Sequence, residues 1–307
     1  MKYVVGIDGG GTKTNCVFAD ESGESIIESS GGPSNFLTIG NDKASSNLLS
    51  IIESGLAKLN SSFENISIIL AGISGAGRKF HADNFRESLH NKFPKNNYKL
   101  YIESDARIAL EGALAGKPGA ILIAGTGSVI FGKDESGKIH RVGGFGRIVG
   151  DEGGGYSIGF KTLKMISKMI DGREADGDIL KKFRTIFNIN SDDDLISLVH
   201  NPGFDVSSIA LFTIKSASEE IAEAKKIIDE ESDELINHIK VIKNKLNLSP
   251  LKLALIGSLV ENKNYYSELL IKKISGIKDV ELTEKKYSPE MGAVLMAKNI
   301  LSQDQSV

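Results

Sequence analysis

Residues 8–14 read Asp8-Gly9-Gly10-Gly11-Thr12-Lys13-Thr14 and directly follow the apolar run Tyr3-Val4-Val5-Gly6-Ile7. That run is typical of a buried strand, and Asn15-Cys16-Val17-Phe18-Ala19-Asp20 reads as a second strand. Three glycines let the turn approach a ligand closely, and its exposed N–H groups can cradle an anion. The pattern predicts a strand–turn–strand phosphate grip, unlike the strand–turn–helix of a Walker P-loop. An ordinary glycine-rich hairpin is the alternative.

A second copy of this pattern lies further along the chain. The apolar strand Ala120–Ala124 leads into Gly125-Thr126-Gly127-Ser128, after which Val129–Gly132 resumes the strand pattern. Two glycine–hydroxyl hairpins indicate two similar halves that hold one polyphosphate between them. The expected phosphate contacts are Gly9, Gly10, Gly11, Thr12, Lys13, Thr14, Gly125, Thr126, Gly127 and Ser128.

The pair of hairpins resembles the superfamily of acetate and sugar kinases, Hsp70 and actin. Further segments narrow the resemblance to the branch of N-acetylglucosamine kinases and BadF/BadG ATPases, which includes archaeal hexokinases and 2-keto-3-deoxygluconate kinases. In family order these segments are Gly32-Pro33-Ser34-Asn35, residues 71–75, Ser104-Asp105-Ala106, residues 143–146, Gly150-Asp151-Glu152-Gly153, Gly257-Ser258 and residues 288–293. The resemblance implies an α/β fold of two actin-like (ribonuclease H-like) domains with a cleft between them, and use of ATP and Mg²⁺.

Composition excludes several other classes of protein. Of 307 residues, 37 are basic and 40 acidic, so the net charge of −3 leaves no polycationic surface for nucleic acid. We expect no membrane partner, because no apolar run approaches the roughly 18 residues of a membrane span. The single cysteine, Cys16, excludes an internal disulfide and favours a cytoplasmic location. One cysteine also cannot supply the thiolates of an iron–sulfur cluster, which BadF-like dehydratase activators carry.

Periodicity predicts alternating strands and helices in the first half and a largely helical stretch, residues 154–248, in the second. We expect two domains, residues 1–114 and 115–307, and the last helix could pack back on the first domain. Apolar spacing predicts one long helix over Ser218–Leu246 and a last helix that starts at Ser288-Pro289-Glu290. In the first half, strands are expected at residues 3–30 (three strands), 66–70 and 98–102. Helices are expected at residues 41–59, 80–93 and 105–114.

The resemblance assigns chemistry to particular residues. Asp8 is the expected Mg²⁺ anchor, through water, and the resemblance makes Asp105 the base that accepts the proton of the sugar hydroxyl. A plain helix cap is the alternative for Asp105. The expected contacts to the sugar are Asn35, Ser74, Asp105, Thr126, Asp151 and Glu152, and those to adenosine are Gly257, Ser258 and Gly292.

Two arginines bear on the substrate. Arg107 and Arg147 flank the expected substrate residues, and arginine binds carboxylates bidentately. They favour a sugar acid, 2-keto-3-deoxygluconate, although Arg107 could face away from the site and Arg147 could pair with Glu152 or contact ATP. N-acetylglucosamine or glucosamine kinase and a broad hexokinase are the alternatives. Phe145 stands where mammalian-type N-acetylglucosamine kinases carry a tryptophan, and this chain has none.

A non-enzyme alternative is a nucleotide-gated sugar-binding regulator. Related regulators carry an added DNA-binding domain, and because the first strand is expected to begin at Tyr3, we expect no such domain ahead of it. An ATPase that acts on a protein partner is a third possibility. The expected partner is therefore a small sugar or sugar acid, and the resemblance allows a homodimer.

Overall fold

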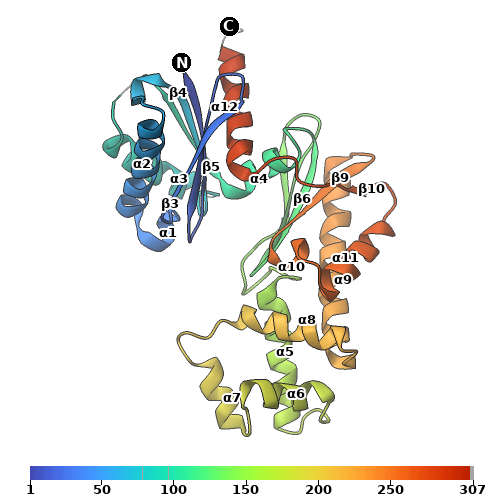
Figure 1. The fold of residues 1–307 in the computed structure, drawn as a ribbon. Coiled ribbons are helices and arrows are strands. Elements are labelled where there is room, and N and C mark those ends of the chain that lie inside the picture. The colour runs from blue at the N-terminus through green and yellow to red at the C-terminus, as the bar shows by residue number, and fades with distance from the viewer. Residues whose placement is uncertain (78, 96, 305–307) are drawn as a thin grey trace. The chain divides into compact units, whose positions relative to one another are not determined.

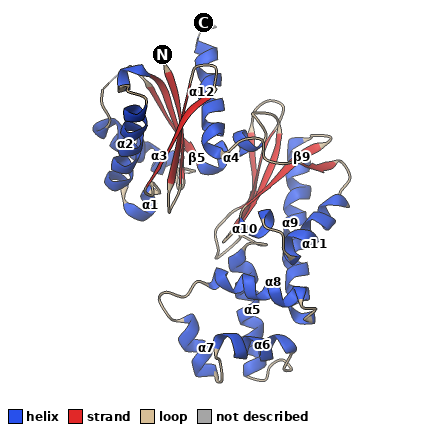
Figure 2. Ribbon diagram, viewed as in Figure 1, coloured by secondary structure: helices blue, strands red, loops and turns tan. Residues whose placement is uncertain are grey.

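The protein folds into two compact units, and the computed structural model describes residues 1–77, 79–95 and 97–304. The first unit comprises Met1–Pro118 and the chain from Glu284 onward, and the second comprises Gly119–Thr283. Each unit contains one mixed five-stranded sheet with helices (Figures 1 and 2), which confirms the expected α/β class. The last helix belongs to the first unit, whereas a division at residue 114 groups it with the second.

The sheet of the first unit has the strand order β3-β2-β1-β4-β5. β2 pairs antiparallel with both β1 and β3, whereas β4 runs parallel to β1 and to β5. The three consecutive antiparallel strands form two hairpins, of which the first contains the glycine-rich turn. The strands are β1 (Tyr3–Gly9), β2 (Thr14–Ala19), β3 (Ser25–Gly31), β4 (Ile66–Ile73) and β5 (Lys99–Ser104).

The sheet of the second unit has the same topology in the order β8-β7-β6-β9-β10. β7 is antiparallel to β6 and β8, and β9 is parallel to β6 and β10. The repeated hairpin seen in the sequence therefore reflects a repeated sheet. The strands are β6 (Gly119–Ala124), β7 (Ser128–Lys133), β8 (Ile139–Gly143), β9 (Leu251–Ile256) and β10 (Val280–Leu282).

Helices cover both faces of the first sheet. Apolar residues of α2 and α3 pack on one face with Val5, Ile7 and Phe18, and those of α4 and α12 pack on the other face with Val4 and Val17. Strand residues alternate between the two cores, as expected for a sheet that is buried on both sides. The helices of this unit are α1 (Phe36–Ile39), α2 (Asn41–Lys58), the 3₁₀ turn η1 (Phe63–Asn65), α3 (Lys79–Lys92), α4 (Asp105–Ala113) and α12 (Pro289–Asp304).

The second unit carries a helical region between β8 and β9. One hydrophobic core joins this region to the sheet and includes Ile158, Phe183, Leu235 and Tyr266. Among the described residues, no helix is both long and apolar enough to cross a membrane. The helices are α5 (Gly155–Ile170), α6 (Asp178–Phe187), α7 (Asp192–Val199), η2 (Val206–Ser208), α8 (Ile209–Ser218), α9 (Ala222–Leu246), α10 (Ser258–Glu261) and α11 (Tyr265–Ser275).

The long helix expected over Ser218–Leu246 is interrupted at its start. α8 ends at Ser218 and α9 begins at Ala222. Glu220 adopts a left-handed conformation (φ 67°), and the backbone N–H of Ile221 bonds back to the carbonyl of Ser216 at 3.1 Å. This is a Schellman-type helix end, which glycine usually marks. A glutamate in that place gives no sequence signal, so the pattern predicted one continuous helix.

Candidate active site

In the turn between β1 and β2, the central residues are exposed and the flanking residues are buried. The N–H of Gly10 donates to the carbonyl of Lys13 at 3.0 Å, which closes the turn. Gly11, Thr12 and Lys13 are exposed, and a Cβ added to Gly11 would meet no atom within 4 Å. Free backbone amides, a hydroxyl and an ammonium group are therefore available at this tip, as an anion-binding turn requires.

Two residues expected to contact phosphate have other roles in the structure. The hydroxyl of Thr14 is fully buried, donates to the carbonyl of Gly32 at 2.8 Å and lies 2.7 Å from the Ser34 hydroxyl. Gly9 is buried as well, and a Cβ there would lie 2.4 Å from Ser34 Oγ. Both residues hold the base of the turn, so we correct their assignment to supporting positions.

The expected sugar-binding residues of the first unit lie directly beside this turn. The backbone N–H groups of Ser34 and Asn35 both donate to the carbonyl of Gly10, at 3.0 and 3.1 Å. The N–H of Ser74 donates to the carbonyl of Gly9 at 2.8 Å, and Asn35 Nδ2 lies 3.5 Å from Ser74 Oγ. Two loops that are distant in sequence are thereby fixed to the phosphate-type turn. Ser34 was missed as a member of this network, although it stands within the Gly-Pro-Ser-Asn segment.

Carboxylates approach one another at the ends of β1, α4 and α12. The pKa of Asp8 is raised from 3.8 to about 6, mainly by burial and then by the charges of Glu290 and Asp105, while the charge of Lys13 lowers it by less. Asp105 is the first residue of α4, where its Oδ1 accepts the N–H of Ala106 at 2.8 Å. The helix cap itself is Ser104, whose hydroxyl accepts the N–H of Arg107, so Asp105 is not needed as the cap. Sequence patterns did not predict Glu290 as a site residue, because nothing about its position in the last helix indicated that it lies near the carboxylate of Asp8.

These residues fit a Mg²⁺ ion that is completed by phosphate. No group of three or more His, Cys, Asp or Glu side chains in the described ranges could hold a metal by itself. Mg²⁺ usually keeps waters and binds through one or two carboxylates together with substrate phosphates. Burial and, after it, the charges of Glu290 and Asp105 raise the pKa of Asp8, and a bound cation would relieve both costs of the ionised carboxylate.

Arg107 is committed to an ion pair within its own helix. Its Nη2 lies 2.9 Å from Oε1 of Glu111, one helical turn later, and the Glu111 side chain is almost fully buried. Removing the arginine from this pair would leave a buried carboxylate without that charge partner, which is costly. The expected contact between Arg107 and a substrate carboxylate stays a prediction, and such a contact would compete with this ion pair.

The second hairpin is also anchored through its backbone. The N–H of Gly125 donates to the carbonyl of Gly127 at 2.9 Å, and the exposed Thr126 stands at the tip. Ser128 is buried, and its hydroxyl donates to the carbonyl of Glu152. Thr126 and the glycines are thus placed to meet a ligand, whereas Ser128 holds the hairpin to the loop that precedes α5.

That loop, residues 144–154, carries Asp151 and Arg147. Asp151 has a left-handed backbone (φ 61°), and its Oδ1 accepts the N–H of Gly146 at 3.0 Å. A Cβ on Gly127 would lie 2.4 Å from Asp151 Oδ2, so the carboxylate rests against the second hairpin. Arg147 is exposed, and its guanidinium lies 5.5 Å from the centre of the Tyr156 ring. Asp151 therefore lies against Gly127, the residue that follows Thr126 in the second hairpin.

The residues expected at adenosine divide between the two units. Gly257 (φ 109°) and the exposed Ser258 lie between β9 and α10, and a Cβ on Gly125 would lie 3.9 Å from Ser258 Oγ. Gly292 is buried in α12, where a Cβ would lie 2.0 Å from the carbonyl of Ile108 in α4. Close packing of two helices explains this glycine, so we withdraw Gly292 from the adenosine contacts.

Comparison with known proteins places the chain in one family. The model of the BadF/BadG/BcrA/BcrD ATPase family matches residues 5–297. A curated relative, the N-acetylmuramic acid/N-acetylglucosamine kinase of Clostridium acetobutylicum, is 32% identical over 97% of this chain and 99% of its own length. The N-acetyl-D-glucosamine kinase of Dictyostelium discoideum is 28% identical over 96% of this chain and 97% of its own.

Solved structures share the fold at low sequence identity. A Chromobacterium violaceum protein, provisionally assigned as an N-acetylglucosamine kinase, superposes with a TM-score of 0.74 at 21% identity, covering 97% of this chain and 99% of the other. The ROK hexokinase of Thermus thermophilus gives 0.59 at 14% identity, with 98% and 99% coverage. These likenesses confirm the actin-like fold. The family match over nearly the whole chain means that this protein belongs to the BadF/BadG/BcrA/BcrD ATPase family.

Proposed function

We propose that this protein transfers the γ-phosphate of ATP to a hydroxyl group of an N-acetylated amino sugar. The family and the two curated kinases make it an ATP-dependent carbohydrate kinase. The observation that supports the proposal most directly is the backbone bonding of Asn35 and Ser74 to the glycine-rich turn. Polar groups suited to sugar hydroxyls thereby stand next to a turn suited to phosphate.

The residues then divide the chemistry among them. Gly10, Gly11 and Thr12 would bind phosphate oxygens through the first turn, and Gly125 and Thr126 through the second. Mg²⁺, anchored by Asp8, would neutralise phosphate charge. The Asp105 carboxylate would accept the proton of the attacking hydroxyl, since phosphoryl transfer otherwise needs mainly positioning and charge neutralisation.

The relatives favour an amino sugar over 2-keto-3-deoxygluconate. The Clostridium enzyme is named for N-acetylmuramic acid and N-acetylglucosamine, and the Dictyostelium enzyme for N-acetyl-D-glucosamine. The ion pair with Glu111 also engages Arg107, one of the two arginines that suggested a keto acid. The alternative of an N-acetylglucosamine kinase therefore replaces the sugar-acid kinase as the preferred activity.

Arg147 still allows recognition of a carboxylate. N-acetylmuramic acid differs from N-acetylglucosamine by a lactyl ether that ends in a carboxylate. No ion pair or hydrogen bond of the Arg147 guanidinium with an acidic side chain is seen across residues 1–77, 79–95 and 97–304, and its side chain is exposed. We include N-acetylmuramic acid among the proposed substrates for this reason.

Cys16 argues against an electron-transfer function of the kind that cysteine-ligated clusters support. It is fully buried, and burial raises the pKa of its thiol well above the usual range. A buried protonated thiol is a poor metal ligand. Kinase activity thus fits this chain better than the activator function known in the wider family.

The test is release of ADP from Mg-ATP with a panel of N-acetylglucosamine, N-acetylmuramic acid, glucosamine, glucose and 2-keto-3-deoxygluconate. We expect the two N-acetylated sugars to give the largest kcat/KM, and ³¹P NMR of the product to identify the phosphorylated hydroxyl. Preference for the keto acid would overturn the proposed substrate class. ATP hydrolysis that no sugar stimulates would instead favour an ATPase acting on a protein partner.

A further inference from the structure

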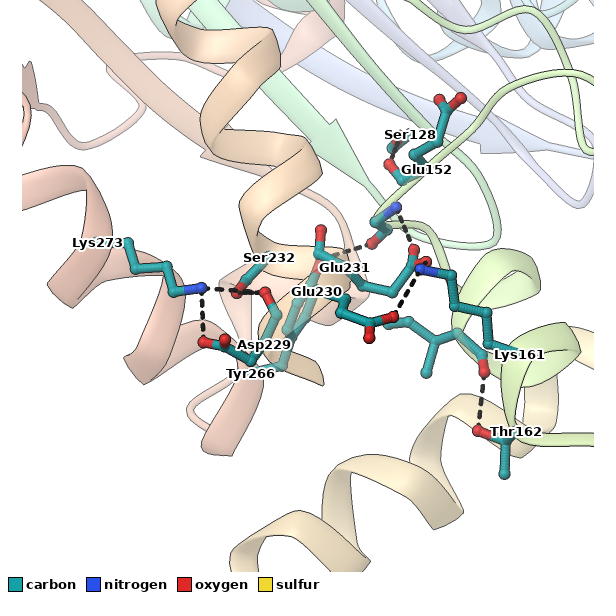
Figure 3. Close-up of polar contacts among 12 residues, drawn as sticks. Ser128, Glu152, Lys161, Thr162, Asp229, Glu230, Glu231, Ser232, Tyr266 and Lys273 are labelled. Carbon is teal, nitrogen blue, oxygen red and sulfur yellow. Dashed lines mark hydrogen bonds and ion pairs between the residues drawn. The ribbon is translucent and has the colours of Figure 1, made fainter. Parts of the chain in front are cut away.

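A buried glutamate of α9 binds the loop in front of α5. The Glu231 side chain, which is labelled in Figure 3, is 1% exposed, and its Oε2 accepts the backbone N–H of Gly153 at 2.6 Å. Lys161 of α5 lies 2.8 Å from the other carboxylate oxygen and supplies the compensating charge. Partial burial alone lowers the pKa of Lys161, but the hydrogen bond and charge of Glu231 raise it overall. Lys161 is therefore charged at neutral pH.

A buried tyrosine of α11 binds the same glycine from the other side. The hydroxyl of Tyr266 donates to the carbonyl of Gly153 at 2.8 Å, and its ring is fully buried. Burial and the neighbouring Glu231 raise the pKa of this phenol well above its usual range, so it remains a donor. Both polar backbone groups of Gly153 are thus held by side chains from two distant helices.

Gly153 stands at a position that suits only glycine. Its φ of 78° lies in the left-handed region, and a Cβ there would lie 2.4 Å from the Leu235 side chain of α9. Glu231 and Leu235 are one helical turn apart, so a single face of α9 both binds and packs against the glycine. The loop is locked to the helical region at this point.

The residues that follow Gly153 connect it to the second hairpin. A Cβ on Gly154 would lie 2.6 Å from the carbonyl carbon of Gly127, so the two backbones are in close contact. The N–H of Gly155 donates to the carbonyl of Gly125, and that of Tyr156 to the carbonyl of Thr126, both at 2.8 Å. A displacement of Gly153 would therefore move the hairpin tip.

We propose that Glu231 and Tyr266 are positioning residues for phosphoryl transfer, which act by fixing Gly153 and, through it, Asp151 and the hairpin 125–128. This inference rests on the proposed kinase function. A buried ion pair is often no more stabilising than apolar residues of similar size. Placement of a reacting group, in contrast, is sensitive to shifts of about 1 Å. The contacts of Glu231 and Tyr266 thus explain a buried charge that fold stability alone explains poorly.

The first variant is Tyr266→Phe, which removes one hydroxyl group. We expect a folded protein in which kcat falls about 10-fold and the KM for ATP rises several-fold, since a 1 Å misplacement can cost up to about 100-fold. Tyr265→Phe is the matched control, because Tyr265 is the preceding residue of α11 and is only partly buried. The control should retain both kinetic constants.

The second pair of variants compares Glu231 with its neighbour. Glu230 also pairs with Lys161, at 3.3 Å, but its side chain is 48% exposed and does not bind Gly153. We expect Glu231→Gln to lower kcat less than Glu231→Leu, because glutamine keeps an acceptor for the N–H of Gly153. Glu230→Gln should leave kcat and the KM for ATP unchanged.

Two further measurements distinguish a positioning role of Glu231 and Tyr266 from a purely structural role, and a failure of this inference from a failure of the proposed kinase function. Kinetics are measured well below each variant's Tm, where the protein is fully folded, and affinity for Mg-ADP is measured by calorimetry without sugar. Lower Mg-ADP affinity in Tyr266→Phe supports positioning even if no sugar is phosphorylated by the wild type. Folded Tyr266→Phe and Glu231→Leu proteins with wild-type kcat, KM and Mg-ADP affinity would overturn the proposal.

Discussion

The side-chain amide of Asn35 lies 3.5 Å from the hydroxyl of Ser74, although 39 residues separate them in the chain. Both residues also bond through their backbone N–H groups to the turn after β1, to Gly10 and Gly9 respectively. The amide oxygen of Asn35 meanwhile accepts the N–H of Leu37 and caps α1. One asparagine therefore has a structural acceptor and a donor that faces the proposed sugar site.

These two functions of Asn35 can be separated by Asn35→Asp. The carboxylate keeps the cap on α1 but loses the amide donor, so we expect a nearly unchanged Tm and a sugar KM raised about 10-fold or more. Asn65→Asp is the control, because the Asn65 amide also donates to a serine hydroxyl, Ser61, outside the proposed site. Equal effects of the two substitutions on sugar KM would remove Asn35 from substrate binding.

Asp105→Asn tests the proposed base. Asparagine retains the shape and the contact at the start of α4 but cannot accept the hydroxyl proton. We expect kcat to fall roughly 10²- to 10⁴-fold, the usual contribution of general base catalysis, with Mg-ADP affinity within about 2-fold of wild type. Asp83→Asn, which removes an exposed carboxylate paired with Arg86, serves as the control. Turnover near the wild-type rate in Asp105→Asn would show that another group accepts the proton.

Asp8→Asn should stabilise the ligand-free protein while it abolishes activity. The pKa of Asp8 is raised from 3.8 to about 6, so the folded state binds more protons than the unfolded state between these values. Stability therefore falls as pH rises through this window, by roughly 2–3 kcal/mol in total, and the loss is complete above it. Asparagine avoids this loss because it carries no charge.

The measurement is the Tm of both proteins without nucleotide, near pH 4.5 and near pH 7.5. The gain in Tm from Asp8→Asn should be clearly larger at the higher pH, because less of the electrostatic cost is present at the lower one. Activity with Mg-ATP should fall at least about 100-fold at either pH. If Asp8→Asn lowers the Tm equally at both pH values, the ionised Asp8 carboxylate does not destabilise the ligand-free protein, and this account of its raised pKa is wrong.

Much of the fold follows from local patterns in the sequence. The two hairpins, the strand–helix alternation and the start of α12 at Pro289 were predicted, because strand and helix periodicities and the proline are local signals. The burial of Thr14 could also have been predicted. Thr14, Cys16 and Phe18 alternate along β2 and therefore share one face, and all three side chains are buried.

Other parts of the site depend on contacts between distant segments. Glu231 lies three residues after Ile228 and four before Leu235, inside the apolar stripe of α9. A charge in such a stripe signals a buried partner, but the sequence does not say that the partner is Gly153. Likewise, a glycine at position 292 is compatible with either a ligand or a helix crossing, and only the packing against Ile108 distinguishes them.

Gly11→Ala tests whether phosphate approaches the first turn. The added methyl group would meet no protein atom within 4 Å, and the backbone of Gly11 does not require a positive φ. Folding and Tm should therefore be unaffected. If a phosphate lies against this backbone, the KM for ATP should rise about 10-fold or more. Gly203→Ala is a control in a surface turn with only an ordinary contact of 3.5 Å. An unchanged KM for ATP would place the phosphates elsewhere.

Arg147→Gln tests the recognition of a substrate carboxylate. The exposed guanidinium rests on the Tyr156 ring, and we expect its loss to lower kcat/KM for N-acetylmuramic acid about 10-fold while that for N-acetylglucosamine changes less than 2-fold. The control is Arg141→Gln, since Arg141 is also exposed and lies 5.1 Å from the centre of the Phe145 ring. An equal fall for both sugars would mean that Arg147 binds a group that they share, or ATP. No change for either would leave stacking on Tyr156 as its only role.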